Sequence, residues 1–119
     1  MTNFDYLLKE PQFKDFAEIA ASAEKVAAID PSIAVIDCRR AMEIAVKWMY
    51  SVDSGLRMPY QDKLVTLLSS FDFRDIVDDD TWKGLELIRR LGNIAVHTNK
   101  KITTDEAVLC LKALYSFFD

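Results

Sequence analysis

The sequence predicts an all-α protein, an up-and-down bundle of four to five helices in a single domain that spans residues 1–119. Only three glycines and three prolines occur in the chain, which leaves little turn material for a sheet of short strands. Apolar residues recur at three- and four-residue intervals, and no stretch alternates apolar and polar residues at period two. Half of the residues are hydrophobic, so one domain of this length can bury a core of its own.

Recognisable ends divide the chain into these helices. Asp30 precedes Pro31, an aspartate suited to the N-cap followed by a proline at the first helical position. Thr103 and Glu106 have the spacing of a capping box, so the last helix opens there. The predicted segments in chain order are a short segment at 4–10, helices at 12–28 and 31–52, a connector at 57–60, a helix at 61–71, an acidic irregular stretch at 72–80, a central helix at 81–97 and a last helix from 103.

A helical wheel of the second helix separates an apolar side from a polar one. Arg39, Glu43 and Lys47 fall on the polar side, where i,i+4 pairs of opposite charge are expected on an exposed surface. In the acidic stretch, Phe73 and Ile76 are the side chains expected to anchor it to the core. The residues predicted for the core are Met42, Trp48, Leu67, Leu87, Leu91, Ile94 and Leu111.

Charge and composition limit the functions to consider. A net charge of −4 and a pI near 5.0 argue against general affinity for nucleic acid. The charge is uneven, because residues 83–101 hold five basic residues and one acidic residue, so that this stretch carries +4 and the remainder −8. No basic region followed by an apolar run opens the chain, and no apolar run approaches membrane-spanning length. We therefore expect a cytoplasmic protein without a membrane partner.

Neither a metal site nor a cofactor is predicted. One histidine and two distant cysteines are too few ligands for a structural zinc site. Cys38 and Cys110 lie on apolar faces, where cysteine usually serves as a small hydrophobe, and a disulfide or redox role is the less favoured alternative. Asp78, Asp79 and Asp80 could hold a metal ion, but negative charge also suits a helix N-terminus, which is the interpretation we favour.

The only histidine marks the candidate site. His97 follows Arg90 by seven residues, which places both on one face of the central helix with Cα atoms ~10 Å apart along the axis. Asn93 and Glu86 fall on the same stripe and are candidate supporting residues. A plain surface helix would present a similar stripe, with Glu86 and Arg90 as an ordinary i,i+4 pair and His97 interacting with the helix dipole. Gly92 could be a close-packing point against another helix.

Three segments in this order resemble a known family. They are Cys38–Glu43 on one helix, Leu64–Leu68 on a short helix and Arg89–His97 on the central helix. Together they resemble a helical domain of unknown function in the HEPN clan, over roughly residues 12 to 118. The most specific part is the run Arg-Leu-Gly-Asn-Ile-Ala-Val-His, because the clan's hallmark is an arginine, four to six intervening residues and a histidine, and six residues intervene here. The resemblance implies an HEPN-like bundle.

Two functions follow from the resemblance. Members of this type often lie N-terminal to the helicase and nuclease parts of proteins like the type I restriction enzyme R subunit. We therefore expect an interaction and dimerisation module, joined to downstream helicase and nuclease domains of the same chain, that acts in defence against foreign DNA. The alternative is a metal-independent endoribonuclease, acting as a homodimer, because active members of the clan line one composite site with an arginine and a histidine from two protomers.

In the endoribonuclease, His97 would exchange protons with the attacking 2′-hydroxyl or the leaving oxygen, and Arg90 would hold the phosphate. Leu91 follows Arg90 where active members commonly carry a polar residue, which favours the interaction module. RNA or DNA remains a possible partner in either case. A third hypothesis is a nucleotide-binding sensor in which Arg90 and its basic neighbours hold phosphate, although no glycine-rich phosphate loop is present.

The end of the chain predicts that these residues are the N-terminal fragment of a longer protein. The last helical pattern is still apolar at Phe117 and Phe118 when the sequence stops at Asp119. A natural C-terminal helix usually finishes with polar or basic residues, because its last carbonyls need partners and the dipole favours positive charge there. We therefore expect further chain that completes this helix.

Overall fold

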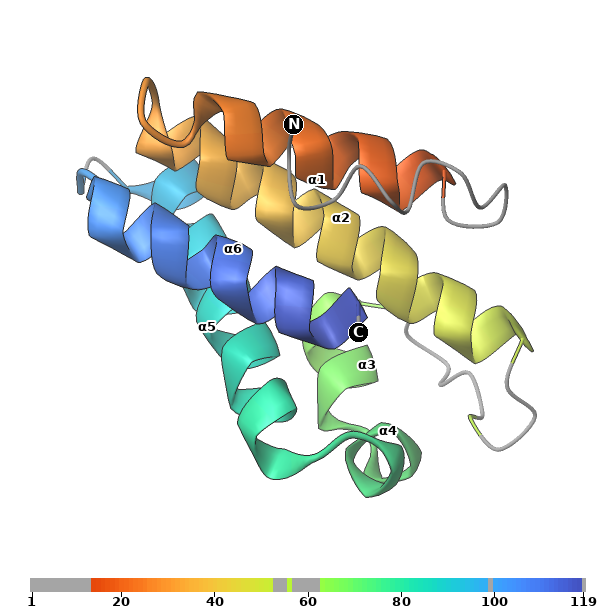
Figure 1. The fold of residues 1–119 in the computed structure, drawn as a ribbon. Helices are drawn as coiled ribbons and strands as arrows, with labels where there is room; N and C mark the ends of the chain where they lie inside the picture. The colour runs from red at the N-terminus through yellow and green to blue at the C-terminus, as the bar shows by residue number, and fades with distance from the viewer. Residues whose placement is uncertain (1–13, 53–55, 57–62, 99, 119) are drawn as a thin grey trace.

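Six α-helices form the regular structure of the residues that the computed structural model describes, which are 14–52, 56, 63–98 and 100–118. No β-strand occurs among them, so the all-α prediction is confirmed, and none of these described helices is long and apolar enough to cross a membrane. The predicted segment at 4–10, the start of the first predicted helix and the connector at 57–60 lie outside the described residues. The helices are α1 Lys14–Val26, α2 Pro31–Val52, α3 Leu64–Ser69, α4 Phe71–Ile76, α5 Asp79–His97 and α6 Thr104–Phe118 (Figure 1).

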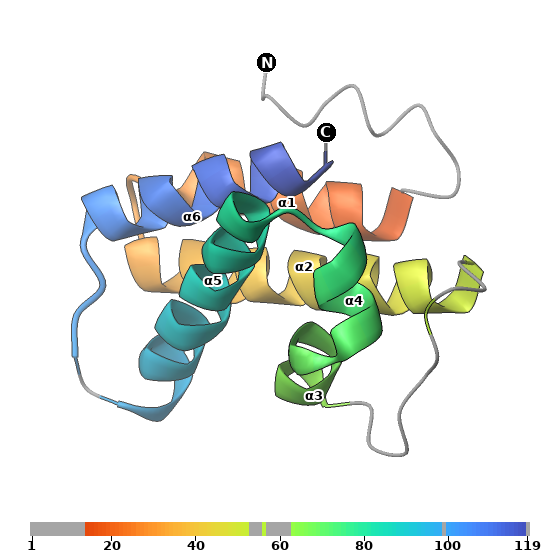
Figure 2. The same cartoon turned by 90° about the horizontal axis from the view of Figure 1, so that it is seen from below.

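The long helices pack around α2. α1 and α2 form an antiparallel hairpin, and α6 lies alongside both of them (Figures 1 and 2). α5 contacts α2 and α6 but crosses them steeply. α3 and α4 make a corner before α5, with α3 in contact with α2, α4 and α5. The polar sides of α2 and α5 therefore come together at a junction that α3 flanks.

Capping side chains fix the helix ends that the sequence indicated. The carboxylate of Asp30 accepts the Ile33 N–H at 3.2 Å in the first turn of α2. At α6 the Thr103 hydroxyl accepts the Glu106 N–H at 3.1 Å, and Glu106 accepts the Thr103 N–H at 2.9 Å, so the predicted capping box is confirmed. Asp78 caps α5 by accepting the Thr81 N–H at 2.7 Å. The helix-terminus interpretation of the aspartates thus has a direct structural basis.

The corner of α3 and α4 corrects two predictions. The predicted helix at 61–71 is interrupted at Ser70, which is extended, and the stretch predicted to be irregular contains helix α4. Ser70 breaks the helix because its hydroxyl caps α4 by accepting the Phe73 N–H at 3.1 Å. Phe73 is fully buried and stacks on the ring of Tyr50, as expected for an anchor. Ile76 is 49% exposed and does not anchor the segment.

The core lies between α1, α2, α5, α6 and the α3–α4 corner. Of the predicted core residues, Met42, Leu67 and Leu91 are buried. The other four are only half-buried, and for the two on α5, Leu87 and Ile94, the reason is that the buried face of this helix is rotated by roughly 70° from the predicted one, at 100° per residue. The residues of α5 that are buried are Leu85, Ile88, Leu91 and Gly92, whereas Leu87, Ile94, Leu111 and Trp48 are half-buried.

Both cysteines belong to this core. Cys38 on α2 and Cys110 on α6 are free thiols with no exposed surface. Burial raises the pKa of both thiols, that of Cys110 to about 12. They therefore pack as small apolar side chains, the role that the sequence favoured.

Candidate functional site

The predicted catalytic pair lies on the exposed side of α5. Arg90 and His97 are both exposed, and neither makes a hydrogen bond or ion pair with another described residue. His97 ends the helix, where positive charge suits the dipole. The rotation of the buried face puts Arg90 and His97 near the middle of the solvent-facing side. Both side chains are therefore available to a partner.

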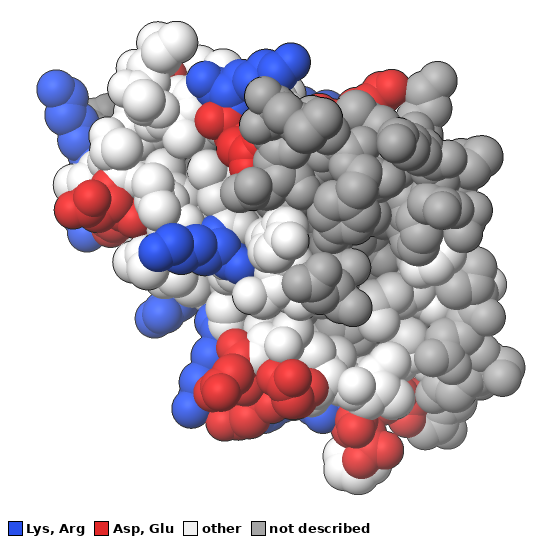
Figure 3. Space-filling model, in the orientation of Figure 1, with Lys and Arg blue, Asp and Glu red and all other residues white. Residues whose placement is uncertain are grey.

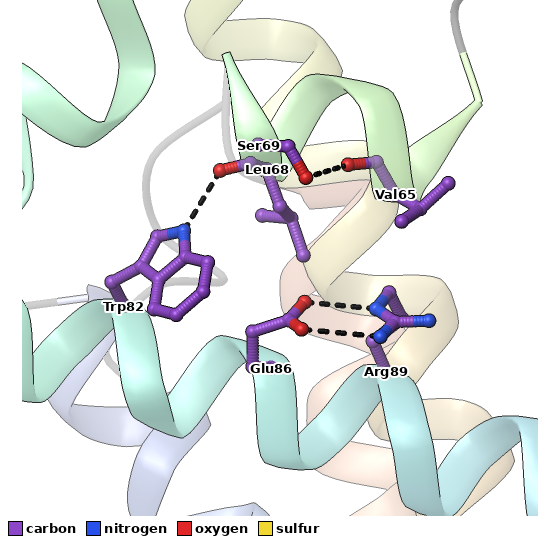
Figure 4. Close-up of polar contacts among 6 residues, drawn as sticks. All are labelled: Val65, Leu68, Ser69, Trp82, Glu86 and Arg89. Carbon is purple, nitrogen blue, oxygen red and sulfur yellow. Dashed lines mark hydrogen bonds and ion pairs between the residues drawn. The ribbon is translucent and has the colours of Figure 1, made fainter. Parts of the chain in front are cut away.

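Glu86 supports a different arginine from the one expected. Its carboxylate accepts two hydrogen bonds from Arg89, from Nε at 2.8 Å and from a terminal nitrogen at 3.1 Å, whereas no ion pair joins it to Arg90, the partner in the surface-helix alternative (Figure 4). This hydrogen bonding is the main cause that lowers the pKa of Glu86 and raises that of Arg89. The pair rises from α5 on the side that faces α3 (Figure 4). Glu86 therefore orients Arg89 toward the junction with α3.

A pocket of about 490 Å³ opens at this junction, and we call it the polar pocket. Three helices line it. α2 contributes Arg39, Glu43 and Lys47, which the helical wheel predicts on an exposed surface. α5 contributes Arg89 and Asn93. The full lining is Arg39, Glu43, Lys47, Lys63, Leu64, Val65, Arg89 and Asn93.

Gly92 allows this junction to close. A Cβ built on Gly92 would lie 2.6 Å from Cδ of Arg39 and 3.0 Å from its Cβ. Only a glycine lets the aliphatic stem of Arg39 lie so close to the backbone of α5, so the close-packing role proposed for Gly92 is confirmed. The Nε atom of Arg39 is buried in consequence and has no hydrogen-bond partner among the described residues.

The polar pocket gathers only part of the predicted site. Asn93 lines it, and Glu86 holds one of its arginines. Arg90 and His97 do not line it. The residues that sequence reasoning missed as a group are Arg39, Lys63 and Arg89. The glycine in the middle of a helix was the signal that could have found them, because it marks where a neighbouring helix approaches.

Two of the three aspartates at the start of α5 have partners within the fold. Asp79 lies 3.2 Å from Nζ of Lys83 and 3.8 Å from a guanidinium nitrogen of Arg74. The Arg74 guanidinium also lies 4.0 Å from the centre of the Trp82 ring, whose Nε1 donates to the Leu68 carbonyl at 2.8 Å. These contacts and the capping bond of Asp78 account for Asp78 and Asp79 by interactions within the fold.

Charges of both signs share the surface. On the face that Figure 3 shows, described basic and acidic side chains alternate, and they do not gather into one large basic patch there. This face therefore lacks the clustered positive charge on which general attraction of the phosphate backbone of nucleic acid depends. Binding of a partner by this domain is therefore expected at a defined site, either the exposed side of α5 or the polar pocket.

No curated protein and no solved structure matches the chain. A family model does match, from the middle of α1 through α6, and it covers the polar pocket and the exposed side of α5. The chain therefore belongs to the family described as "Domain of unknown function (DUF4145)", whose model matches residues 21–119.

Proposed function

We propose that this domain is an interaction and dimerisation module at the N-terminus of a larger DNA helicase and nuclease, of the kind found in type I restriction enzyme R subunits. Its role would be to join protomers and position the motor in cytoplasmic defence against foreign DNA. The proposal rests on the HEPN-like arrangement of the arginine and histidine motif and on the surface that this motif occupies.

One observation carries the proposal, which is the unengaged side of α5. Arg90 and His97 are exposed and unpaired among the described residues, and Val96, which is 53% exposed, lies at the edge of their face, roughly 100° around the helix from His97. An exposed apolar side chain beside a free polar face suits a contact with a second copy, since a two-fold axis brings the same surface of both copies together.

Light scattering of the purified chain tests the interface. We expect a dimer at roughly tens of micromolar, the range of a weak interface. Val96→Glu should give monomers, because it places a charge in the contact. Val108→Glu is the matched control, a half-exposed valine on α6 that should leave the dimer intact. A monomeric wild type, or a Val96→Glu variant that still dimerises, would overturn the proposal.

The second candidate function is a metal-independent endoribonuclease. It is favoured by the same two residues, because His97 is free to exchange protons and Arg90 to hold a phosphate. Their separation of ~10 Å along one helix makes a compact site easier to build from two protomers.

Cleavage of single-stranded and structured RNAs in EDTA tests this function. We expect activity to disappear in His97→Ala and Arg90→Ala and to persist in Arg40→Ala, whose side chain is 62% exposed on α2. The folding of each variant is checked by circular dichroism. Cleavage that requires magnesium, or that survives either site substitution, would exclude the mechanism.

A further inference from the structure

The polar pocket carries positive charge that its own carboxylates do not balance. Four cationic side chains line it, two from α2 and one each from α5 and the residue before α3. Lys47 pairs with Glu43 at 3.3 Å, and Arg89 is bonded to Glu86. Arg39 and Lys63 make no ion pair with a described residue. Two positive charges therefore face a concave surface without a partner in the described part of the chain.

The guanidinium of Arg39 has a buried nitrogen, Nε, without a hydrogen-bond acceptor among the described residues. Packing of its stem over Gly92 restricts where the side chain can move. Its Nε–H is shielded from solvent and has no hydrogen-bond partner among the described residues. A buried donor without an acceptor is unfavourable, and most such groups in folded proteins are paired. An oxygen bound at the guanidinium would complete this arrangement.

We propose that the polar pocket binds the phosphate group of a small phosphate monoester. The two unbalanced charges match a phosphate monoester, which carries about −1.5 to −2 at pH 7, better than a carboxylate with −1. The planar guanidinium of Arg39 can bond two phosphate oxygens, and the amide of Asn93 is a further donor. Leu64 and Val65 offer an apolar wall to the rest of the molecule.

The size and setting of the polar pocket fit a small molecule. Its volume of about 490 Å³ lies within the roughly 300–1,000 Å³ of typical ligand sites. This site is separate from the exposed face of α5, so the inference goes beyond the proposed function and does not depend on Arg90 or His97.

Titration of the ¹⁵N-labelled chain, followed by two-dimensional NMR, tests the proposal. The probes are inorganic phosphate, phenyl phosphate and benzoate, each at the same ionic strength set with sodium chloride. We expect saturable shifts of the Asn93 and Leu64 amides, with phenyl phosphate binding most tightly, because its ring can contact the apolar wall. Benzoate should bind at least tenfold more weakly. The absence of saturable shifts with either phosphate, or equal binding of benzoate, would overturn the proposal.

Two adjacent arginines provide the matched variants. Arg39→Gln should weaken phenyl phosphate binding by tenfold or more, whereas Arg40→Gln should leave it unchanged, because Arg40 lies outside the polar pocket and pairs with Asp37. Lys63→Gln, at an exposed position, should also weaken binding and serves if Arg39→Gln does not fold. Equal binding by Arg39→Gln and Arg40→Gln, or by Lys63→Gln and wild type, would overturn the assignment. Phosphate binding and dimerisation are measured separately on the wild type, so that failure of the dimer and failure of this site are distinguishable.

Discussion

At the scale of single residues, Gly92 decides how closely α2 and α5 approach. We predict that Gly92→Ala lowers the free energy of unfolding by up to about 2 kcal/mol, because overpacking costs about 1–3 kcal/mol and alanine gains about 1 kcal/mol over glycine in a helix interior. The new Cβ would lie 2.6 Å from Cδ of Arg39 and 3.0 Å from its Cβ, so more than the flexible end of that side chain must move. Urea denaturation measures the change in the free energy of unfolding, and a stabilised variant would contradict the close contact between Gly92 and Arg39.

The same substitution in an Arg39→Ala background isolates the contact. Without Cγ and Cδ of the arginine, the contacts at 2.6 Å and 3.3 Å are removed, and only Cβ of residue 39 remains, at 3.0 Å. Gly92→Ala should then be neutral or stabilising by up to about 1 kcal/mol, so the two changes are strongly non-additive. Additive effects of the two substitutions would show that the clash lies elsewhere.

Single residues also show why half of the site could be predicted. The spacing of Arg90 and His97 defines one helix face, and that face is exposed as expected. Arg39 was placed on an open surface because a wheel describes one helix in isolation. In the folded chain, α5 and the start of α3 cover this side of α2. Contacts between helices distant in sequence, which no local pattern contains, create the polar pocket.

At the scale of elements, two adjacent serines differ in their roles at the α3–α4 corner, because Ser70 caps α4 whereas Ser69 bonds only within α3. Tyr50 donates its hydroxyl hydrogen to the Leu67 carbonyl at 2.6 Å, so Ser70 must donate in its own bond with Tyr50 while it accepts the Phe73 N–H. We predict that Ser70→Ala lowers the free energy of unfolding by about 1–2 kcal/mol, as loss of a cap does.

Ser69→Ala is the matched control for this corner. Ser69 is exposed and bonds only the Val65 carbonyl within its own helix, so its replacement should change stability by less than about 0.5 kcal/mol. Denaturation curves of both variants measure the difference, and hydrogen exchange of the Phe73 amide should accelerate only in Ser70→Ala. Equal effects of the two substitutions would remove the capping role.

The break at Ser70 had a signal in the sequence that periodicity concealed. Leu64, Leu67 and Leu68 continue at helical spacing into Phe71, and this favours one helix across the break. Yet a serine followed two residues later by Asp72 is typical of a helix start, with a cap and an acidic first turn. Capping competes with helix continuation at such a position. Here the packing of Phe73 against Tyr50 favours the capped start of α4 over a continuous helix.

Acid should loosen the starts of α5 and α6. Backbone hydrogen bonds from Thr81 and Thr103 lower the pKa of Asp78 and Glu106 below their ordinary values of 3.8 and 4.5. A folded-state pKa below the unfolded one adds stability above the unfolded pKa, and this is lost as the pH falls through the folded pKa. We therefore predict that the urea midpoint declines below about pH 4.5.

Asp78→Asn separates the cap from its charge. Asparagine caps a helix about as well as aspartate but does not titrate, so the variant should keep its stability at pH 7 and lose less of it on acidification. Urea midpoints from pH 7 down to pH 2 give both curves. Parallel curves for the variant and the wild type would show that Asp78 does not contribute to the acid dependence.

At the scale of the whole molecule, helix positions were more predictable than helix orientation. Caps and apolar periods located α2, α5 and α6 within a few residues. The buried face of α5 was misjudged, because Ile94 and Leu87 are apolar but sit at the edge of the contact, whereas Leu85 and Gly92 face the neighbours directly. The steep crossing of α5 over α2 and α6 selects which side is buried, and that angle depends on packing between helices.

The buried thiols of Cys38 and Cys110 report on the integrity of this packing, because each sits on a helix at the centre of the bundle. A disulfide reagent reacts with a thiol that is both exposed to solvent and ionised. In the folded chain the two thiols are fully buried, and burial raises the pKa of each, so neither requirement is met. We predict that the native protein at pH 8 is labelled only as fast as the core opens, and that both thiols react at once in denaturant. Rapid labelling of the native protein would contradict the packing of α2 against α6.

A cavity on α5, a helix that holds neither cysteine, should accelerate this labelling. Leu91→Ala removes a buried side chain of α5 and should lower the free energy of unfolding by about 2–5 kcal/mol. If the thiols are exposed by opening of the whole core, labelling becomes roughly 30-fold faster or more, because each 1.4 kcal/mol changes the open population tenfold. Val96→Ala, an exposed position one turn further along α5, should leave the rate unchanged. An unchanged rate in Leu91→Ala would mean that the thiols open locally, with α2 and α6 separating while α5 stays in place.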